Sequence, residues 1–168
     1  AYESNLDPVL RLMHRTGIQS TGWLDTGDKC IRSHLAQVDI DLFCNDWTTL
    51  RPVVRDDIAP FVVASVDIEC NSSTGKFPDA NIPGDACFQI AISLCKFGSD
   101  VPYDKTCLCY KKTDSNLEGC DIRSYATERE MLEAFQKYLH NKDVDIITGW
   151  NIFGFDMEYI YKRAQINQ

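Results

Sequence analysis

Two acids, Asp67 and Glu69, come directly after the apolar run 61–66. The run is rich in β-branched residues and predicts a buried strand, along which alternation places both carboxylates on one face. Two ionised carboxylates near each other and near an apolar core are unfavourable unless a cation compensates their charge. The pair therefore indicates a site for Mg²⁺ or Mn²⁺, which prefer oxygen ligands. The alternative is an exposed strand end whose acids contact only solvent.

A second candidate group lies in the segment 149–156, which reads Gly-Trp-Asn-Ile-Phe-Gly-Phe-Asp. The segment follows a short predicted strand at 145–148 and opens a predicted helix, so Asp156 falls in or near the first helical turn. An acid at this position is also explained by the helix dipole alone. Likewise, Asn151 is compatible with an ordinary turn residue and Phe155 with a core residue.

The two groups are more informative together than apart. Binding sites of open α/β sheets lie at the carboxyl ends of strands and in the loops that follow. If the predicted strand 145–148 pairs with the run 61–66, Asp67, Glu69 and Asp156 face one another. Three carboxylates suit a pair of cations about 4 Å apart, which polarise a phosphodiester, activate water and stabilise the leaving oxygen. The acids therefore predict a centre for metal-dependent phosphodiester hydrolysis.

The elements that would position these acids follow an α/β pattern. The clearest is a helix at 127–140, because Thr127 and Glu130 have the spacing of a capping box ahead of an apolar face. The order β-β-β-α-β-α predicts an α/β fold with a mixed sheet whose front section is antiparallel. The expected strands and helices are 61–66, 88–94, 106–110, 127–140, 145–148 and 155–163, with a Ser-, Gly- and Pro-rich loop at 71–85.

The first third of the chain reads as part of a separate domain. Ser4 or Asn5 is expected to cap a helix that ends at Gly17. Alternation of apolar and polar residues over 36–42 predicts a half-buried strand. A junction rich in proline and charge follows. The predicted domains are 1–58, part of a β-rich N-terminal domain, and 59–168, the α/β domain.

Composition narrows the function classes. The 168 residues are 44% hydrophobic and 25% charged, which excludes disordered and fibrous classes. The net charge of −8 argues against binding duplex nucleic acid by charge alone, but not against an acidic pocket that reaches phosphates through cations. No apolar run approaches the roughly 20 residues of a membrane span, and the polar start does not resemble a signal peptide. We expect a soluble intracellular protein with no membrane partner.

The cysteines are expected to be reduced thiols. Eight are present, but without a signal peptide and with enough chain for a real core a disulfide framework is disfavoured. Cys107 and Cys109 are separated by one residue, which is not the spacing of a zinc knuckle.

The segments that carry the acids resemble the exonuclease motifs of B-family DNA polymerases. The Asp-Ile-Glu of 67–69 is similar to the first motif. The segment 151–156, an Asn, three residues and Phe-Asp, is similar to the second. The segment 127–132 resembles the stretch just upstream of that second motif. The N-terminal section resembles the delta-type replicative members and their viral relatives, so the similarity covers essentially the whole chain; its matching segments are 2–5, 9–13 and 22–24.

The resemblance implies a ribonuclease H-like 3′–5′ proofreading exonuclease domain of a replicative DNA-directed DNA polymerase. By the family pattern, Asp67, Glu69 and Asp156 are catalytic and hold two Mg²⁺ or Mn²⁺ ions, and Glu69 also helps to orient the attacking water. Asn151 and Phe155 would contact the last nucleotides of a single-stranded 3′ end. The implied partners are primer–template DNA, a sliding clamp and accessory polymerase subunits. The implied location is the nucleus, or the replication site of a virus.

One part of the family pattern is not found in the chain. The third exonuclease motif has the form Tyr-x-x-x-Asp, but Tyr159 is followed four residues later by Arg163, and Tyr161 by Gln165. The resemblance therefore implies most, but not all, of an exonuclease domain, without the palm and fingers that carry polymerisation. We expect weak metal binding and little nuclease activity from these 168 residues alone.

Two other functions remain open from the sequence. One is a stand-alone ribonuclease H-like 3′–5′ exonuclease, which would have no use for the polymerase-like section 1–60. The other is an inactivated nuclease fold that serves as a binding module, against which the presence of all three acids argues.

Overall fold

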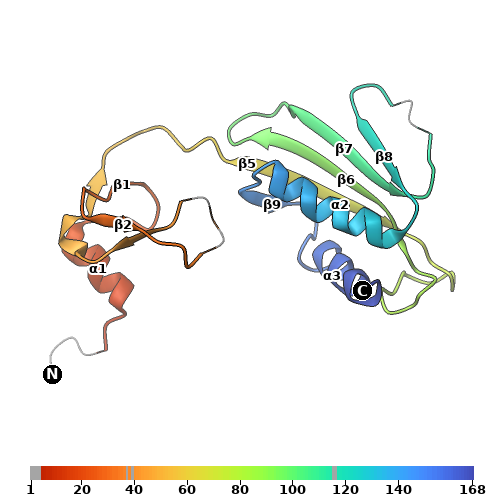
Figure 1. Cartoon of the computed structure of the whole chain (residues 1–168), viewed down its shortest axis with the longest axis horizontal. Coiled ribbons are helices and arrows are strands. Elements are labelled where there is room, and N and C mark those ends of the chain that lie inside the picture. Colours follow the sequence, from red (N-terminus) through yellow and green to blue (C-terminus); the bar gives the residue numbers. More distant parts are fainter. Residues whose placement is uncertain (1–4, 37, 39, 115–116) are drawn as a thin grey trace. The chain divides into compact units, whose positions relative to one another are not determined.

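The protein is described by a computed structural model covering residues 5–36, 38, 40–114 and 117–168. The chain divides into two compact units, 1–57 and 58–168, which are described separately (Figure 1). The assignment of 1–58 and 59–168 as functional domains stays a prediction.

The first unit is built from short elements. It contains helix α1 and two antiparallel strand pairs, β1 with β4 and β2 with β3. None of its described residues is buried, so it has no core of its own within 5–36, 38 and 40–57. Its elements are α1 (Pro8–Thr16), β1 (Trp23–Asp25), β2 (Cys30–Arg32), β3 (Leu42–Cys44), a 3₁₀ turn η1 (Trp47–Thr49) and β4 (Arg51–Val53).

The cap of α1 differs from the sequence-based expectation. Asp7, and not Asn5, caps the helix: its Oδ1 accepts hydrogen bonds from the backbone of Val9 and Leu10 at 2.8 and 3.4 Å. Pro8 at the first helical position makes the preceding residue the natural cap. Ser4 lies outside the described residues. The helix ends at Gly17 as expected, with a left-handed φ of 72°.

The strand predicted at 36–42 is wrong. Of the described residues in this range, only Leu42 belongs to a strand, β3. The carboxylate of Asp41 accepts hydrogen bonds from the backbone of Leu35 and Ala36 at 2.8 and 3.1 Å, which closes a local turn instead of leaving the backbone for a partner strand. These bonds also lower the pKa of Asp41, the bond from Ala36 most. Residues 37 and 39 lie outside the described residues.

The second unit is a mixed α/β fold. Its five-stranded sheet has the order β8-β7-β6-β5-β9, with parallel pairs at both ends and antiparallel pairs in the middle. The α/β class and the antiparallel front section predicted from the sequence are therefore confirmed. The strands are β5 (Val62–Cys70), β6 (Cys87–Lys96), β7 (Asp104–Tyr110), β8 (Asp121–Tyr125) and β9 (Ile146–Thr148).

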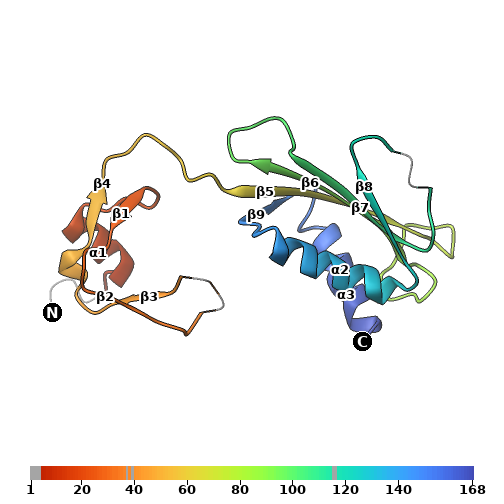
Figure 2. The same cartoon turned by 45° about the horizontal axis from the view of Figure 1, so that its top comes forward.

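Two helices, α2 (Glu128–Asn141) and α3 (Asp156–Ile166), lie on the same side of this sheet (Figures 1 and 2). The capping box predicted for α2 is present, with Thr127 and Glu130 bonded to each other's backbone. The core lies between the helices and one face of the sheet. Its members include Val62, Val66, Ile68, Ile90, Ile92, Leu94, Leu108, Met131, Leu132, Phe135, Tyr138, Ile152, Tyr159 and Ile160.

Strand β8 was not predicted, because its sequence Asp-Ile-Arg-Ser-Tyr is mostly polar and lies at an edge of the sheet. Only Ile122 and Tyr125 are half-buried along it. All eight cysteines are free thiols. Among the described helices, none has the length and apolar character needed to cross a bilayer.

Candidate functional site

The carboxyl-terminal half of β5 presents the first two acids. Burial alternates along the strand: Val66 and Ile68 point into the core, whereas Asp67 and Glu69 are exposed on the opposite face. This is the alternation expected from the sequence. The acids lie opposite small or neutral residues of β6, since Asp67 pairs with Ala91 and Glu69 with Gln89. Neither neighbour can neutralise a carboxylate, so the negative charge on this face is uncompensated by β6.

Strand β9 brings the second acidic segment to the same edge. It runs parallel to β5, with Ser65 opposite Thr148, so the two carboxyl ends lie side by side as expected. The chain then turns at Gly149, where a Cβ atom would lie under 3.0 Å from the carbonyl oxygen of Val66. Only glycine lets the backbone pass this close to β5.

A tight turn links β9 to α3. The carbonyl of Asn151 accepts the backbone N–H groups of Gly154 and Phe155 at 2.9 and 3.0 Å. Asn151 itself has a left-handed φ of 51°, a conformation that asparagine tolerates better than most residues. Its side-chain oxygen lies against Gly154, where a Cβ would collide with it. Asn151 is exposed, and Ile152 anchors the turn in the core.

Asp156 is the first residue of α3 and is only 3% exposed. The backbone of Ile68, the residue between Asp67 and Glu69 on β5, is close enough to the Asp156 carboxylate to lower its pKa. Burial and, secondarily, the charge of Asp67 raise the pKa of Asp156, against the lowering effect of the backbone bonds. Residues separated by almost ninety positions in the sequence are thereby brought together.

The donor set fits a hard cation, although no preformed cage is present. Within the described residues, no three His, Cys, Asp or Glu side chains are arranged to hold a metal ion. Asp67 and Asp156 interact, and Glu69 lies two residues further along the same strand face. All donors are carboxylate oxygens, and the ionised form of Asp156 is disfavoured by burial and by Asp67. A divalent cation would offset both effects.

Phe155 lies beside a groove at the start of α3. Its ring packs against Phe77 of the loop 71–86, with 5.2 Å between centroids, and against Tyr159, with 5.3 Å. The groove has a volume of about 320 Å³ and lies between Phe77–Ala80 and the first two turns of α3. Phe77 is 77% exposed, which is unusual for a large apolar side chain.

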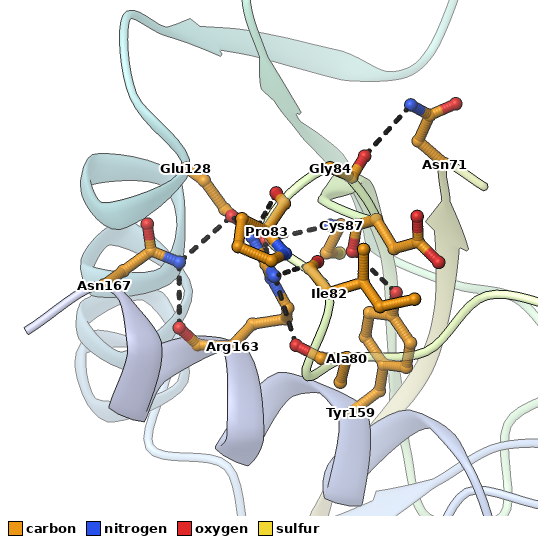
Figure 3. A network of polar contacts seen from close by, with 11 residues as sticks. Asn71, Ala80, Ile82, Pro83, Gly84, Cys87, Glu128, Tyr159, Arg163 and Asn167 are labelled. Atoms are coloured by element: carbon orange, nitrogen blue, oxygen red, sulfur yellow. Dashed lines mark hydrogen bonds and ion pairs between the residues drawn. The ribbon is translucent and has the colours of Figure 1, made fainter. Parts of the chain in front are cut away.

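A buried polar network holds the loop 71–86 against the two helices (Figure 3). Arg163 of α3 donates two hydrogen bonds to Glu128 of α2, at 2.8 and 2.5 Å. The same guanidinium donates to three carbonyls of the loop, those of Ala80, Ile82 and Pro83. Glu128 also accepts bonds from the backbone of Cys87 and the side chain of Asn167.

Asp85 completes this network from within the loop. It is fully buried, and its carboxylate accepts bonds from the backbone of Asp79 and from the backbone and hydroxyl of Ser73. These bonds, the one from Asp79 most, lower the pKa of Asp85. Its carbonyl accepts a bond from the hydroxyl of Tyr159 at 2.7 Å.

The sequence carries a signal for this network outside the exonuclease-like motifs. Glu128 precedes the apolar residues Met131 and Leu132 at helical spacing, and Arg163 follows Tyr159 and Ile160 in the same way. A charged residue on an apolar stripe indicates a buried ion pair. The partner in the loop could not be read from spacing.

Comparison with known proteins agrees with the resemblance. The sequence model of the family described as "DNA polymerase family B, exonuclease domain" matches residues 1–168. A DNA polymerase of Paramecium bursaria Chlorella virus NY2A is 32% identical over 98% of this chain and 18% of its own length. A DNA polymerase of Acanthamoeba polyphaga mimivirus is 35% identical over 96% of the chain and 9% of its own. The DNA polymerase delta catalytic subunit of Bos taurus is 32% identical over 98% of the chain and 15% of its own length.

The chain therefore spans less than a fifth of each of these relatives. The match extends over both units, including the first, which carries none of the three candidate catalytic acids Asp67, Glu69 and Asp156. The chain belongs to the exonuclease-domain family of the B-family DNA polymerases.

Proposed function

We propose that the chain is the proofreading region of a replicative DNA-directed DNA polymerase, which removes nucleotides from a single-stranded 3′ end. The observation that carries this proposal is the parallel pairing of β9 with β5, which brings the buried Asp156 beside the strand that carries Asp67 and Glu69. Membership of the family supports the reaction class. The polymerase names of the relatives support the whole-protein function.

In this proposal Asp67, Glu69 and Asp156 hold two Mg²⁺ or Mn²⁺ ions. When bound, such ions polarise a phosphodiester and activate water. The protein's own contribution is to keep three carboxylates on two rigid elements, β5 and α3. The raised pKa of Asp156 means that its charged form is disfavoured until a cation is present. Glu69, exposed at the strand end, would orient the attacking water.

Asn151 and Phe155 would position the terminal nucleotides. Both precede Asp156 in the turn that leads into α3, and Asn151 is exposed there. Phe155 offers a half-buried ring whose neighbour Phe77 is exposed. Stacking of an unpaired base on an aromatic ring is worth about 1–3 kcal/mol and does not require a particular base. Selectivity for errors would follow because a mismatched end separates from the template more easily than a paired end.

The finer structural proposals are a ribonuclease H-like sheet in residues 59–168 and a piece of a β-rich N-terminal polymerase domain in 1–58. The mixed five-stranded sheet with helices on one side supports the first. The family match over 1–57, a section for which a stand-alone exonuclease has no use, supports the second. Primer–template DNA, a sliding clamp and accessory subunits are the proposed partners. The nucleus, or a viral replication site, is the proposed location.

The test is degradation of an end-labelled single strand in Mn²⁺. We compare the 168-residue chain with a longer polypeptide that continues past Gln168 and includes a Tyr-x-x-x-Asp segment. The longer polypeptide should cleave from the 3′ end, and Asp67→Ala or Asp156→Ala should abolish cleavage. Asp121→Asn, an exposed acid of β8, is the matched control and should leave cleavage unchanged.

Two results would contradict the proposal or its corollary. Absence of metal-dependent cleavage by the longer polypeptide would favour a binding module. Robust cleavage by the 168-residue chain that depends on Asp67 would show that the missing motif is not required.

A further inference from the structure

The Arg163–Glu128 pair needs an explanation beyond the proposed chemistry. Both side chains are almost fully buried, at 3% and 6% exposure. Burying an ion pair costs hydration free energy that the attraction alone does not reliably recover, so such a pair is weak evidence of stabilisation. Here each group is fully bonded, and the partners of Arg163 other than Glu128 all lie in one loop.

The stretch of the loop that Arg163 holds begins close to the exposed ring of Phe77. The three carbonyls held by Arg163 belong to residues 80–83, only three to six positions after Phe77. Asp85 ties Ser73 and Asp79, on either side of Phe77, to one carboxylate. Phe77 is therefore an exposed side chain on a loop whose backbone is fixed on both sides.

We infer that Arg163 and Glu128 are positioning residues for single-stranded DNA: their buried pair fixes the loop 71–86 so that Phe77 and Phe155 form a groove for one unpaired base. This inference rests on the proposed function and names a part of the same site. Figure 3 shows the anchor, with Arg163 between Glu128 and the loop residues Ala80, Ile82 and Pro83.

The residues that line the groove favour binding by base stacking over binding by charge attraction. Among the described residues that line it, Lys162 is the one cation; it is paired with Glu158 at 2.6 Å, and Asp79 adds another negative charge. The rings of Phe77, Phe155 and Tyr159 supply apolar surface. A nucleobase is flat and uncharged, so it can stack on these rings without a free cation in the groove.

The test measures binding without metal, so that no cleavage occurs. The full chain is titrated in EDTA onto a single-stranded oligonucleotide that carries fluorescent 2-aminopurine at its 3′ end, and both anisotropy and quenching by stacking are recorded. The variants are Phe77→Ala, Arg163→Lys and the double variant. Lysine keeps the charge beside Glu128, but its ammonium cannot reproduce the fork that reaches the loop carbonyls.

We expect Phe77→Ala to weaken binding about tenfold and to reduce quenching. Arg163→Lys should weaken binding measurably, but by no more than Phe77→Ala does. The double variant should bind like Phe77→Ala alone, because Arg163 acts through Phe77. Lys142→Met is the matched control. Lys142 lies at the opposite end of α2 from Glu128 and pairs with Asp104 of β7, so this variant should bind like the wild type.

Three results would overturn the inference: wild-type binding by Arg163→Lys, additive losses in the double variant, or an equal loss in Lys142→Met. Failure of the wild-type chain to bind the oligonucleotide would overturn it as well. The nuclease proposal is decided separately, since cleavage that survives Asp67→Ala refutes that proposal and leaves the binding result in EDTA unchanged.

Discussion

Two glycines of the turn between β9 and α3 lead to opposite predictions for the same substitution. At Gly149, an added Cβ would lie under 3.0 Å from the carbonyl oxygen of Val66 and 2.9 Å from Cδ1 of Ile152. The oxygen belongs to the backbone of β5 and cannot rotate away, so β9 must shift. At Gly154 the obstacle is the side-chain amide of Asn151, which can rotate. Neither glycine has a left-handed φ, so alanine adds steric conflict and no backbone strain.

The loss of stability at each glycine depends on which atom the added Cβ would meet. Overpacking against atoms that cannot move costs about 1–3 kcal/mol, and Gly149→Ala should be at the upper end. For a chain of this size that lowers the melting temperature by roughly 10 °C. Gly154→Ala should cost less than about 1 kcal/mol, because a rotamer change relieves the conflict. Its effect should instead fall on nucleotide binding, since Asn151 is displaced.

The assay is urea unfolding followed by circular dichroism, combined with oligonucleotide binding in EDTA. Gly149→Ala should lower the unfolding midpoint clearly, whereas Gly154→Ala should leave it nearly unchanged and weaken binding several-fold. A Gly149→Ala protein as stable as the wild type would refute the close approach of this turn to β5. Equal destabilisation by both substitutions would refute the distinction between a backbone and a side-chain obstacle.

Further predictions concern charge and capping. Asp156→Asn should raise the free energy of unfolding at neutral pH, because the folded-state pKa of Asp156 is raised. The gain should vanish as the pH falls below the ordinary range of a carboxyl, where aspartic acid is neutral in both the folded and the unfolded state. Urea titrations at several pH values check this. Arg163→Met should cost about 3–5 kcal/mol in the same assay, because it leaves Glu128 buried without its cation, whereas Lys142→Met at a partly exposed pair should cost about 1 kcal/mol or less. Thr127→Ala should cost about 1 kcal/mol through loss of the capping box, and an unchanged midpoint would contradict that role.

Features with a local cause were predictable from the sequence. The run 61–66 lies on a central strand, as predicted, and Thr127 caps α2 where its spacing to Glu130 indicated. The burial predicted for the whole run is wrong: only Val62, Ala64 and Val66 are buried, because both helices cover the same face of the sheet. The parallel pairing of β9 with β5 was a conditional expectation, and the register of Ser65 with Thr148 satisfies it. In each case the deciding interactions lie within a few residues or follow from the general rules of sheet topology.

Features that depend on distant partners were not predictable. Alternation at 36–42 matched a strand, but Asp41 offers the backbone a closer partner than any neighbouring strand. Strand β8 is polar because it lies at an edge, so its hydrogen bonds to β7 leave no apolar pattern. The loop 71–85 appeared featureless because its order depends on Arg163, some eighty residues away.

Helix α3 carries Asp156 at its first residue and Arg163 two turns later. A short helix moves as a stiff rod, so a displacement at either end is transmitted to the other. We therefore expect an exchange of Glu128 for another residue to shift Asp156 as well, although Glu128 and Asp156 belong to separate networks. Glu128 and Arg163 therefore constrain each other, because either residue left alone would be a buried charge without its partner.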